Sequence, residues 1–109
     1  MSEVRAFPTG ARALVGRWRH VAPWDSDDYL AEYQVSFDGQ KFAVTGHDLN
    51  DGEHFEITDI SWDGATLRFR SLMPSTRREG LNEFTPQPDG SVESRFTFTV
   101  VERMERYET

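Results

Sequence analysis

The chain has 109 residues, no cysteine and a formal net charge of −7 at pH 7. This length suits a single domain, and without cysteine the fold does not depend on disulfides or on an oxidising compartment. The acidic balance argues against nucleic acid or an anionic membrane surface as partner, because both require a basic face. No apolar run is long enough to cross a bilayer and the first ten residues lack the apolar stretch of a signal peptide, so we expect a cytoplasmic protein.

Residues 1–12 show little periodicity and are expected to be an irregular lead-in to one domain that spans residues 13–109. The next segment alternates between small or apolar residues and arginines, which is typical of a β-strand. The side chains expected on one face of this strand are Leu14, Gly16, Trp18 and His20.

The run Leu14-Val15-Gly16-Arg17-Trp18 resembles the Gly-x-Trp signature in the first strand of lipocalins and the wider calycin group. This resemblance implies a small β-barrel in which Trp18 closes one end beneath a basic side chain near the last strand. Arg103 or Arg106 would fill that role. The chain is shorter than a typical lipocalin and lacks the Thr-Asp-Tyr motif, so it is most similar to the compact bacterial lipocalin-like domains.

Three Asp-Gly pairs, at residues 38–39, 51–52 and 63–64, separate runs in which apolar and polar residues alternate, and a fourth pair lies at 89–90. Asp-Gly favours a two-residue type I′ hairpin turn, because both residues tolerate a positive φ. Such regularly spaced turns predict an antiparallel meander. We therefore expect an all-β fold, a single up-and-down meander of seven or eight strands that forms a small lipocalin-like barrel.

The alternation also predicts which side chains face the interior. Two-residue loops would place Val35 opposite Phe42 and Gly46 opposite Ile57. In the fourth strand Phe55 and Ile57 have one parity and Ile60 and Trp62 the other, which predicts a β-bulge near residues 58–59 and Asp59 close to Arg68. The inward residues expected on the other strands are Tyr33, Val35, Phe37, Phe42, Val44, Gly46, Leu67, Phe69, Ser71, Gly80, Asn82, Phe84, Val92, Ser94, Phe96, Phe98 and Val100.

The predicted interior is aromatic with a polar minority, which is the usual lining of a small-molecule pocket. Side chains alone can also fill so small a barrel. The primary hypothesis is that the barrel binds a small apolar or aromatic molecule and needs no cofactor. Its contact residues would be Tyr33, Phe42, Phe55, Trp62, Phe69 and Phe96, with His20, Asn82 and Ser94 orienting the ligand.

A second hypothesis is an acidic interaction module with a solid core. Residues 25–63 hold 11 acidic residues against the single Lys41. Such a surface would attract a basic partner, although a solvated outer face explains the same pattern. The edges of the sheet also offer a pairing surface for a homodimer.

A third hypothesis is a small-barrel enzyme in which His20 and Asp48 act as general acid and base. The sequence leans against an enzyme, since it contains no nucleophile elbow and no Gly-rich phosphate loop. His47 and His54 flank the second hairpin, but the expected register places Glu56 opposite His47, and we predict no metal site.

Overall fold

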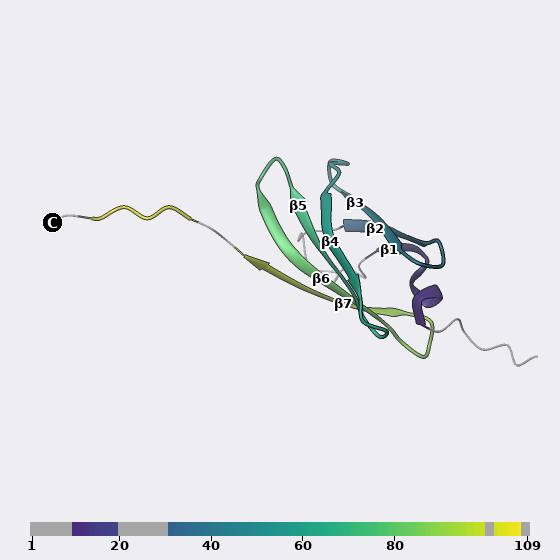
Figure 1. Ribbon diagram of the computed structural model, residues 1–109. Helices are drawn as coiled ribbons and strands as arrows, with labels where there is room; N and C mark the ends of the chain where they lie inside the picture. The colour runs from purple at the N-terminus through teal and green to yellow at the C-terminus, as the bar shows by residue number, and fades with distance from the viewer. Residues whose placement is uncertain (1–9, 20–30, 100–101, 108–109) are drawn as a thin grey trace, which may run out of the picture.

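The computed structural model describes residues 10–19, 31–99 and 102–107. These residues form a short 3-10 helix, η1 (Gly10–Leu14), and seven antiparallel strands in two sheets (Figure 1). The all-β class with antiparallel pairing of neighbouring strands is confirmed, whereas the expected single meander is divided into two sheets. No helix among the described residues is long and apolar enough to cross a membrane.

The first sheet has the order β1 (Gly16–Arg19), β2 (Ala31–Phe37) and β3 (Phe42–Asp48). The second has the order β4 (Glu56–Trp62), β5 (Leu67–Met73), β6 (Arg78–Pro86) and β7 (Val92–Thr99). An isolated bridge between His47 and His54 joins β3 to the segment before β4. Within the described residues β1 and β7 are not paired with each other, so closure into a barrel is not confirmed.

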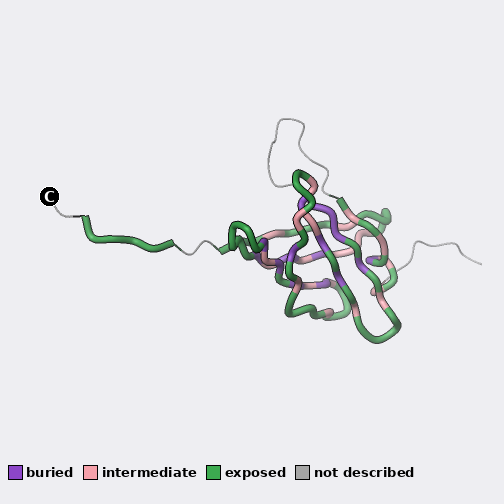
Figure 2. Tube along the Cα trace, turned by 90° about the horizontal axis from the view of Figure 1, so that it is seen from above, coloured by how far each residue is buried: buried purple, intermediate pink, exposed green. Residues whose placement is uncertain are grey.

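The core lies between the two sheets and is built from aromatic rings. Tyr33 of β2 meets Phe69 and Phe84 of the second sheet edge to face, with ring centroids 5.3 and 5.5 Å apart. Gly46 makes room for Tyr33, because a Cβ atom there would lie 2.6 Å from the tyrosine ring. Figure 2 shows the buried residues in purple on both sheets. The inward prediction is confirmed for Tyr33, Val35, Val44, Gly46, Leu67, Phe69, Ser71, Gly80, Asn82 and Phe84, which are all buried.

The first two hairpins form, but each ladder is shifted by two residues from the expected register. Val35 pairs with Val44 and not with Phe42. Across the second hairpin the Phe55 N–H donates to the Gly46 carbonyl, so Gly46 faces Phe55 rather than Ile57. A shift of two residues keeps the same side chains on the same face, because the strand period is two. The predicted faces were therefore correct although the predicted partners were wrong.

At the first hairpin the shift arises because Asp38 precedes the loop instead of lying in it, whereas at the second hairpin Asp51 lies within a longer loop, residues 49–52. The Asp38 carboxylate accepts the N–H groups of Gln40 and Lys41, both at 2.8 Å. Asp63 binds the backbone in the same way at the third hairpin. Only the glycine takes a positive φ, 102° at Gly39, so these are not type I′ turns with both central residues left-handed.

The predicted β-bulge in β4 is confirmed. The pairing with β5 is interrupted after Thr58 by Asp59 and Ile60, and Asp59 has a positive φ of 54°. The bulge turns Ile60 outward, where it is 38 % exposed and not part of the core. It also moves Asp59 along the sheet, so that its carboxylate lies 3.6 Å from Arg70 and not beside Arg68 as predicted.

Arg68 instead holds the carboxylate of Asp63, and this contact predicts a measurable pKa. The hydrogen bond from Arg68, together with the N–H groups of Thr66 and Ala65, lowers the pKa of Asp63 to about 2. A lowered pKa stabilises the fold above the unfolded-state value of 3.8, and this stabilisation is lost as the pH falls towards 2. We expect Arg68→Gln to raise the Asp63 pKa in an NMR titration of the carboxyl carbon. Arg70→Gln is the control that leaves it unchanged, and equal values in all three proteins would contradict the assignment.

The last strand differs most from the prediction. Val92 and Phe96 are half-buried, whereas Ser94 is exposed and Phe98 is 51 % exposed. β7 has β6 on one side, and the short β1 of the opposite layer does not cover its length. Val100 lies outside the described residues. The strand ends at Thr99, and residues 102–107 have no regular structure and run away from the sheets (Figures 1 and 2), so no eighth strand is found in the described parts of the chain.

Candidate functional site

Trp18 lies where the core meets the edge of the first sheet. β1 is shorter than predicted, since Leu14 belongs to η1 and not to the strand, and η1 itself begins inside the segment expected to be irregular. The indole N–H of Trp18 donates to the Leu14 carbonyl at 2.8 Å. Leu14 is fully buried and η1 lies against β2 and β6. The helix therefore anchors Trp18 at one end of the core.

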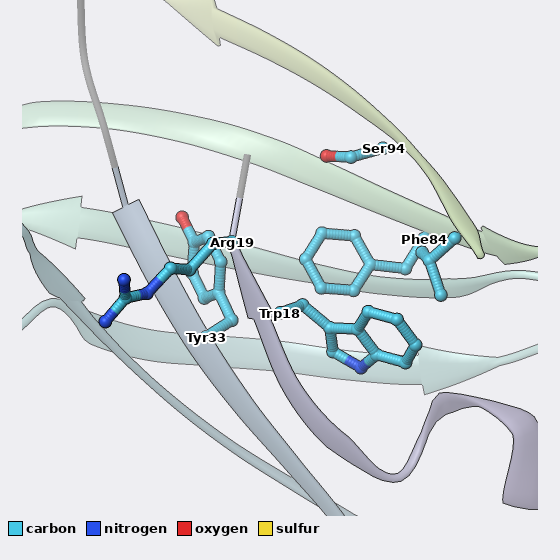
Figure 3. A pocket seen from close by; sticks show the side chains of 6 residues that line it. Trp18, Arg19, Tyr33, Phe84 and Ser94 are labelled. Atoms are coloured by element: carbon cyan, nitrogen blue, oxygen red, sulfur yellow. The ribbon is translucent and has the colours of Figure 1, made fainter. Parts of the chain in front are cut away.

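A small cavity opens on one side of Trp18, between β1 and β7. Its volume is about 40 Å³, room for roughly three water molecules at about 10–15 Å³ each but not for an aromatic ring. Figure 3 shows the side chains that line it, with the Trp18 and Tyr33 side chains from the first sheet and the Phe84 and Ser94 side chains from the second. The lining residues are Trp18, Arg19, Tyr33, Phe84, Val92 and Ser94.

A larger groove opens on the surface beside the same tryptophan, between η1 and the β6–β7 turn. Its volume is about 300 Å³, which reaches the lower end of the range for small-molecule sites, about 300–1,000 Å³. Trp18 lines both spaces. The groove is lined by apolar and polar residues, namely Ala13, Val15 and Trp18 together with Arg12, Gln87, Asp89, Gly90 and Ser91.

The centre of the molecule, where the sequence placed the ligand, is filled by its own side chains. Asn82 is 1 % exposed and is hydrogen bonded inside the core. Its amide nitrogen donates to the Ser71 hydroxyl at 2.9 Å, and its oxygen accepts from the Tyr33 hydroxyl at 3.4 Å. Phe55 and Phe69 pack against the Tyr33 ring. These contacts give the polar groups a structural role.

The other predicted ligand residues are spread over the molecule. Phe42 packs against Trp62 with ring centroids 5.4 Å apart, in a cluster separate from the cavity. Phe96 lies on β7, stacked on Phe98. Tyr33 and Ser94 line the cavity with Trp18, and His20 lies outside the described residues. Of the nine predicted residues, the structure thus brings Tyr33 and Ser94 together at this cavity.

Arg103 and Arg106 do not cover Trp18 in the structure. Both are exposed and belong to the segment 102–107 that runs away from the sheets (Figure 1). The groove beside Trp18 is instead lined by Ala13 of η1, by Val15, which follows η1, and by Gln87 of the β6–β7 turn. Sequence reasoning missed these residues because no local pattern indicates that η1 and this turn meet.

The first sheet also carries a charged cluster that the sequence did not reveal. Glu32 has a side chain only 7 % exposed, on the face opposite the aromatic core. Its carboxylate lies 3.1 Å from Arg17, 3.5 Å from Arg19 and 3.6 Å from His47. The ladder explains this, because Arg19 and His47 are the residues opposite Glu32 on its two neighbouring strands. The alternating arginines of β1 were the sequence feature that could have indicated this charged cluster.

The two hairpin histidines face each other. His47 pairs with His54 across a loop of residues 49–52, with ring centroids 5.8 Å apart, so the expected pairing of His47 with Glu56 was wrong. Among the described residues no three His, Cys, Asp or Glu side chains are grouped to hold a metal ion. Asp48, the predicted partner of His20, is buried and accepts the Asn50 N–H in this turn. A pairing of Asp48 with His20 stays a prediction.

Several acidic residues of the middle segment have structural partners within the chain. Asp38 and Asp63 bind loop N–H groups, and Glu32 is held by two arginines. Glu53 accepts the N–H and the hydroxyl of Ser75, at 2.8 and 2.6 Å, and so links two turns. These contacts explain part of the acidic composition without a basic partner. An acidic docking surface stays a prediction.

No protein-family model matches this chain, and no curated protein or solved structure matches it. The resemblance to lipocalins stays a prediction from the Gly16-x-Trp18 pattern and the series of hairpins.

Proposed function

We propose that this chain is a lipocalin-like domain that binds a small apolar or aromatic molecule against Trp18, in the groove between η1 and the β6–β7 turn. The observation that carries the proposal is that Trp18 lines both the groove and the inner cavity. Apolar contact area combined with polar groups that orient the ligand is the usual lining of a small-molecule site, and the groove offers both. Because side chains fill the centre of the core, the groove beside Trp18 is a better candidate site than the middle of a barrel.

The residue types around the groove suggest how each residue would contact the ligand. Trp18, Val15 and Ala13 would supply apolar contact area. Gln87 and Arg12, which also line the groove, would orient a polar end of the ligand. The indole of Trp18 is held by its hydrogen bond to the Leu14 carbonyl, so the ligand would meet a ring whose orientation is already set. A preset ring lowers the entropy lost on binding.

The test uses 1-anilinonaphthalene-8-sulfonate, a fluorescent apolar anion, titrated into dilute folded protein. We expect saturable binding of one molecule per chain. Trp18→Ala is expected to weaken binding at least about tenfold, because a lost aromatic contact of about 1.4 kcal/mol corresponds to that factor. The native circular dichroism of the variant would show that the sheets persist.

The matched control is Trp62→Ala. Trp62 is also half-buried and was among the predicted ligand residues, but it packs on Phe42 away from the groove. Its replacement is expected to leave the affinity for the dye within about twofold, since no groove contact is lost. An equal loss in both variants, or no saturable binding by the unmodified protein, would rule out the groove as the site.

A further inference from the structure

His47 and His54 lie opposite each other where the chain passes from the first sheet to the second. His47 belongs to β3, and its isolated bridge to His54 joins β3 to the segment before β4. The residues that flank the two histidines form the backbone hydrogen bonds of this bridge, at 2.8 and 2.9 Å. His47 and His54 are therefore a non-hydrogen-bonded pair, the type of antiparallel pair in which the two side chains lie closest together.

Both imidazole rings lie on the same side of this pair and can be reached by solvent. Directly opposed residues of antiparallel strands share a face, and the two ring centroids are 5.8 Å apart. His54 is exposed, and the side chain of His47 is 32 % exposed. The expected register, with Glu56 opposite His47, was one reason to predict no metal site. The register found in the structure brings a second imidazole to that place instead.

The buried carboxylate of Glu32 favours His47 as a metal ligand. Glu32 is the residue opposite His47 on β2, and its carboxylate lies 3.6 Å from Nε2 of the imidazole. Metal-bound histidines commonly direct their other ring N–H at a carboxylate, which fixes the tautomer and makes the ligand nitrogen more basic. A proton on Nε2 leaves the Nδ1 lone pair available for a metal ion. Arg17 and Arg19 contact the same carboxylate from β1, so Glu32 separates their positive charges from the histidine pair.

We propose that His47 and His54 together bind one Cu²⁺ ion, with water completing its coordination. Imidazole is a good ligand for divalent copper, nickel and zinc, and copper forms the most stable complexes of the three. Within residues 10–19, 31–99 and 102–107 no third His, Cys, Asp or Glu side chain is grouped with the pair. Two protein ligands are fewer than zinc sites use, whereas the tetragonal coordination of Cu²⁺ accepts nitrogen ligands together with water. The bound ion would link β3 to the segment that leads into the second sheet.

The test is a calorimetric titration of the folded protein with Cu²⁺. The chain has no cysteine, so no thiolate competes for the ion. We expect saturable binding of one ion per chain. His54→Gln is expected to weaken binding at least about tenfold, because changes outside the ligands already cost about 10–100-fold at metal sites. Glu56→Gln is the matched control, since Glu56 is exposed and is the residue that the expected register placed opposite His47. Its affinity is expected to stay within about threefold, because water and salt screen a surface charge.

A second measurement asks whether the folded pairing of the two histidines holds the ion. A ligand that binds the folded chain more tightly than the unfolded chain raises stability as its concentration rises. We expect the urea midpoint of the unmodified protein to increase with Cu²⁺ concentration and that of His54→Gln to stay constant. Absence of saturable binding, equal affinity in the unmodified protein and His54→Gln, or an unchanged midpoint at saturating Cu²⁺ would overturn the proposal. An equal loss of affinity in Glu56→Gln would overturn the assignment to the histidine pair.

Discussion

Replacing Phe69 by alanine is expected to destabilise the protein by about 3–5 kcal/mol, the range for buried phenylalanines. Phe69 is fully buried, and its ring meets both Tyr33 and Phe84 edge to face. The sequence suggested a ligand contact at this position, whereas its burial makes it a core residue. Urea unfolding followed by circular dichroism measures the loss as a lower midpoint with an unchanged slope.

Phe98→Ala is the matched comparison for this variant. Phe98 is the same residue type in the same sheet but is 51 % exposed. Its replacement is expected to cost less than about 1 kcal/mol, because half of the ring is already in water. If both variants lost the same stability, the two-sheet packing described for Phe69 would be contradicted.

Asn82→Leu is expected to cost about 2–4 kcal/mol, although leucine has nearly the same volume. The change removes the amide that donates to the Ser71 hydroxyl and accepts from the Tyr33 hydroxyl, and a buried polar group that loses its hydrogen bond costs about 1–3 kcal/mol. If Asn82 lined a wet pocket, water would replace the lost bonds and stability would hardly change. The free energy of unfolding in urea therefore separates a structural amide from a ligand-binding one.

A double variant sharpens the test. In Ser71→Ala/Asn82→Leu the hydroxyl that had lost its partner is also removed, so less polar surface is left unsatisfied. We expect this variant to be about 1 kcal/mol more stable than the sum of the two single changes predicts, since a pair replaced by apolar groups is nearly neutral. Strict additivity would show that Ser71 and Asn82 do not interact in solution.

Local features of this protein were predictable from the sequence. The two-residue period of the strands identified Tyr33, Phe69 and Asn82 as inward residues, and all three are buried. The change of parity between Ile57 and Ile60 predicted the bulge, which is found at Asp59. These successes share one cause. The face of a side chain and the position of a turn depend on neighbouring residues, and a register error of two leaves the face unchanged.

What each inward-facing side chain packs against was decided by the tertiary structure. Alternation indicates that Asn82 and Phe98 point to one side of a sheet, but it does not show what lies there. Asn82 meets Tyr33 and Ser71, which are far away in sequence, so its amide is satisfied within the core. Phe98 is 51 % exposed, and it meets Phe96 and Arg78 of its own sheet. The sequence by itself determined the strands, their faces and the bulge. Only the packing of one sheet on the other decided that the centre is solid and that the hollow spaces lie beside Trp18. The reason is that this packing depends on contacts between segments that are distant in the sequence.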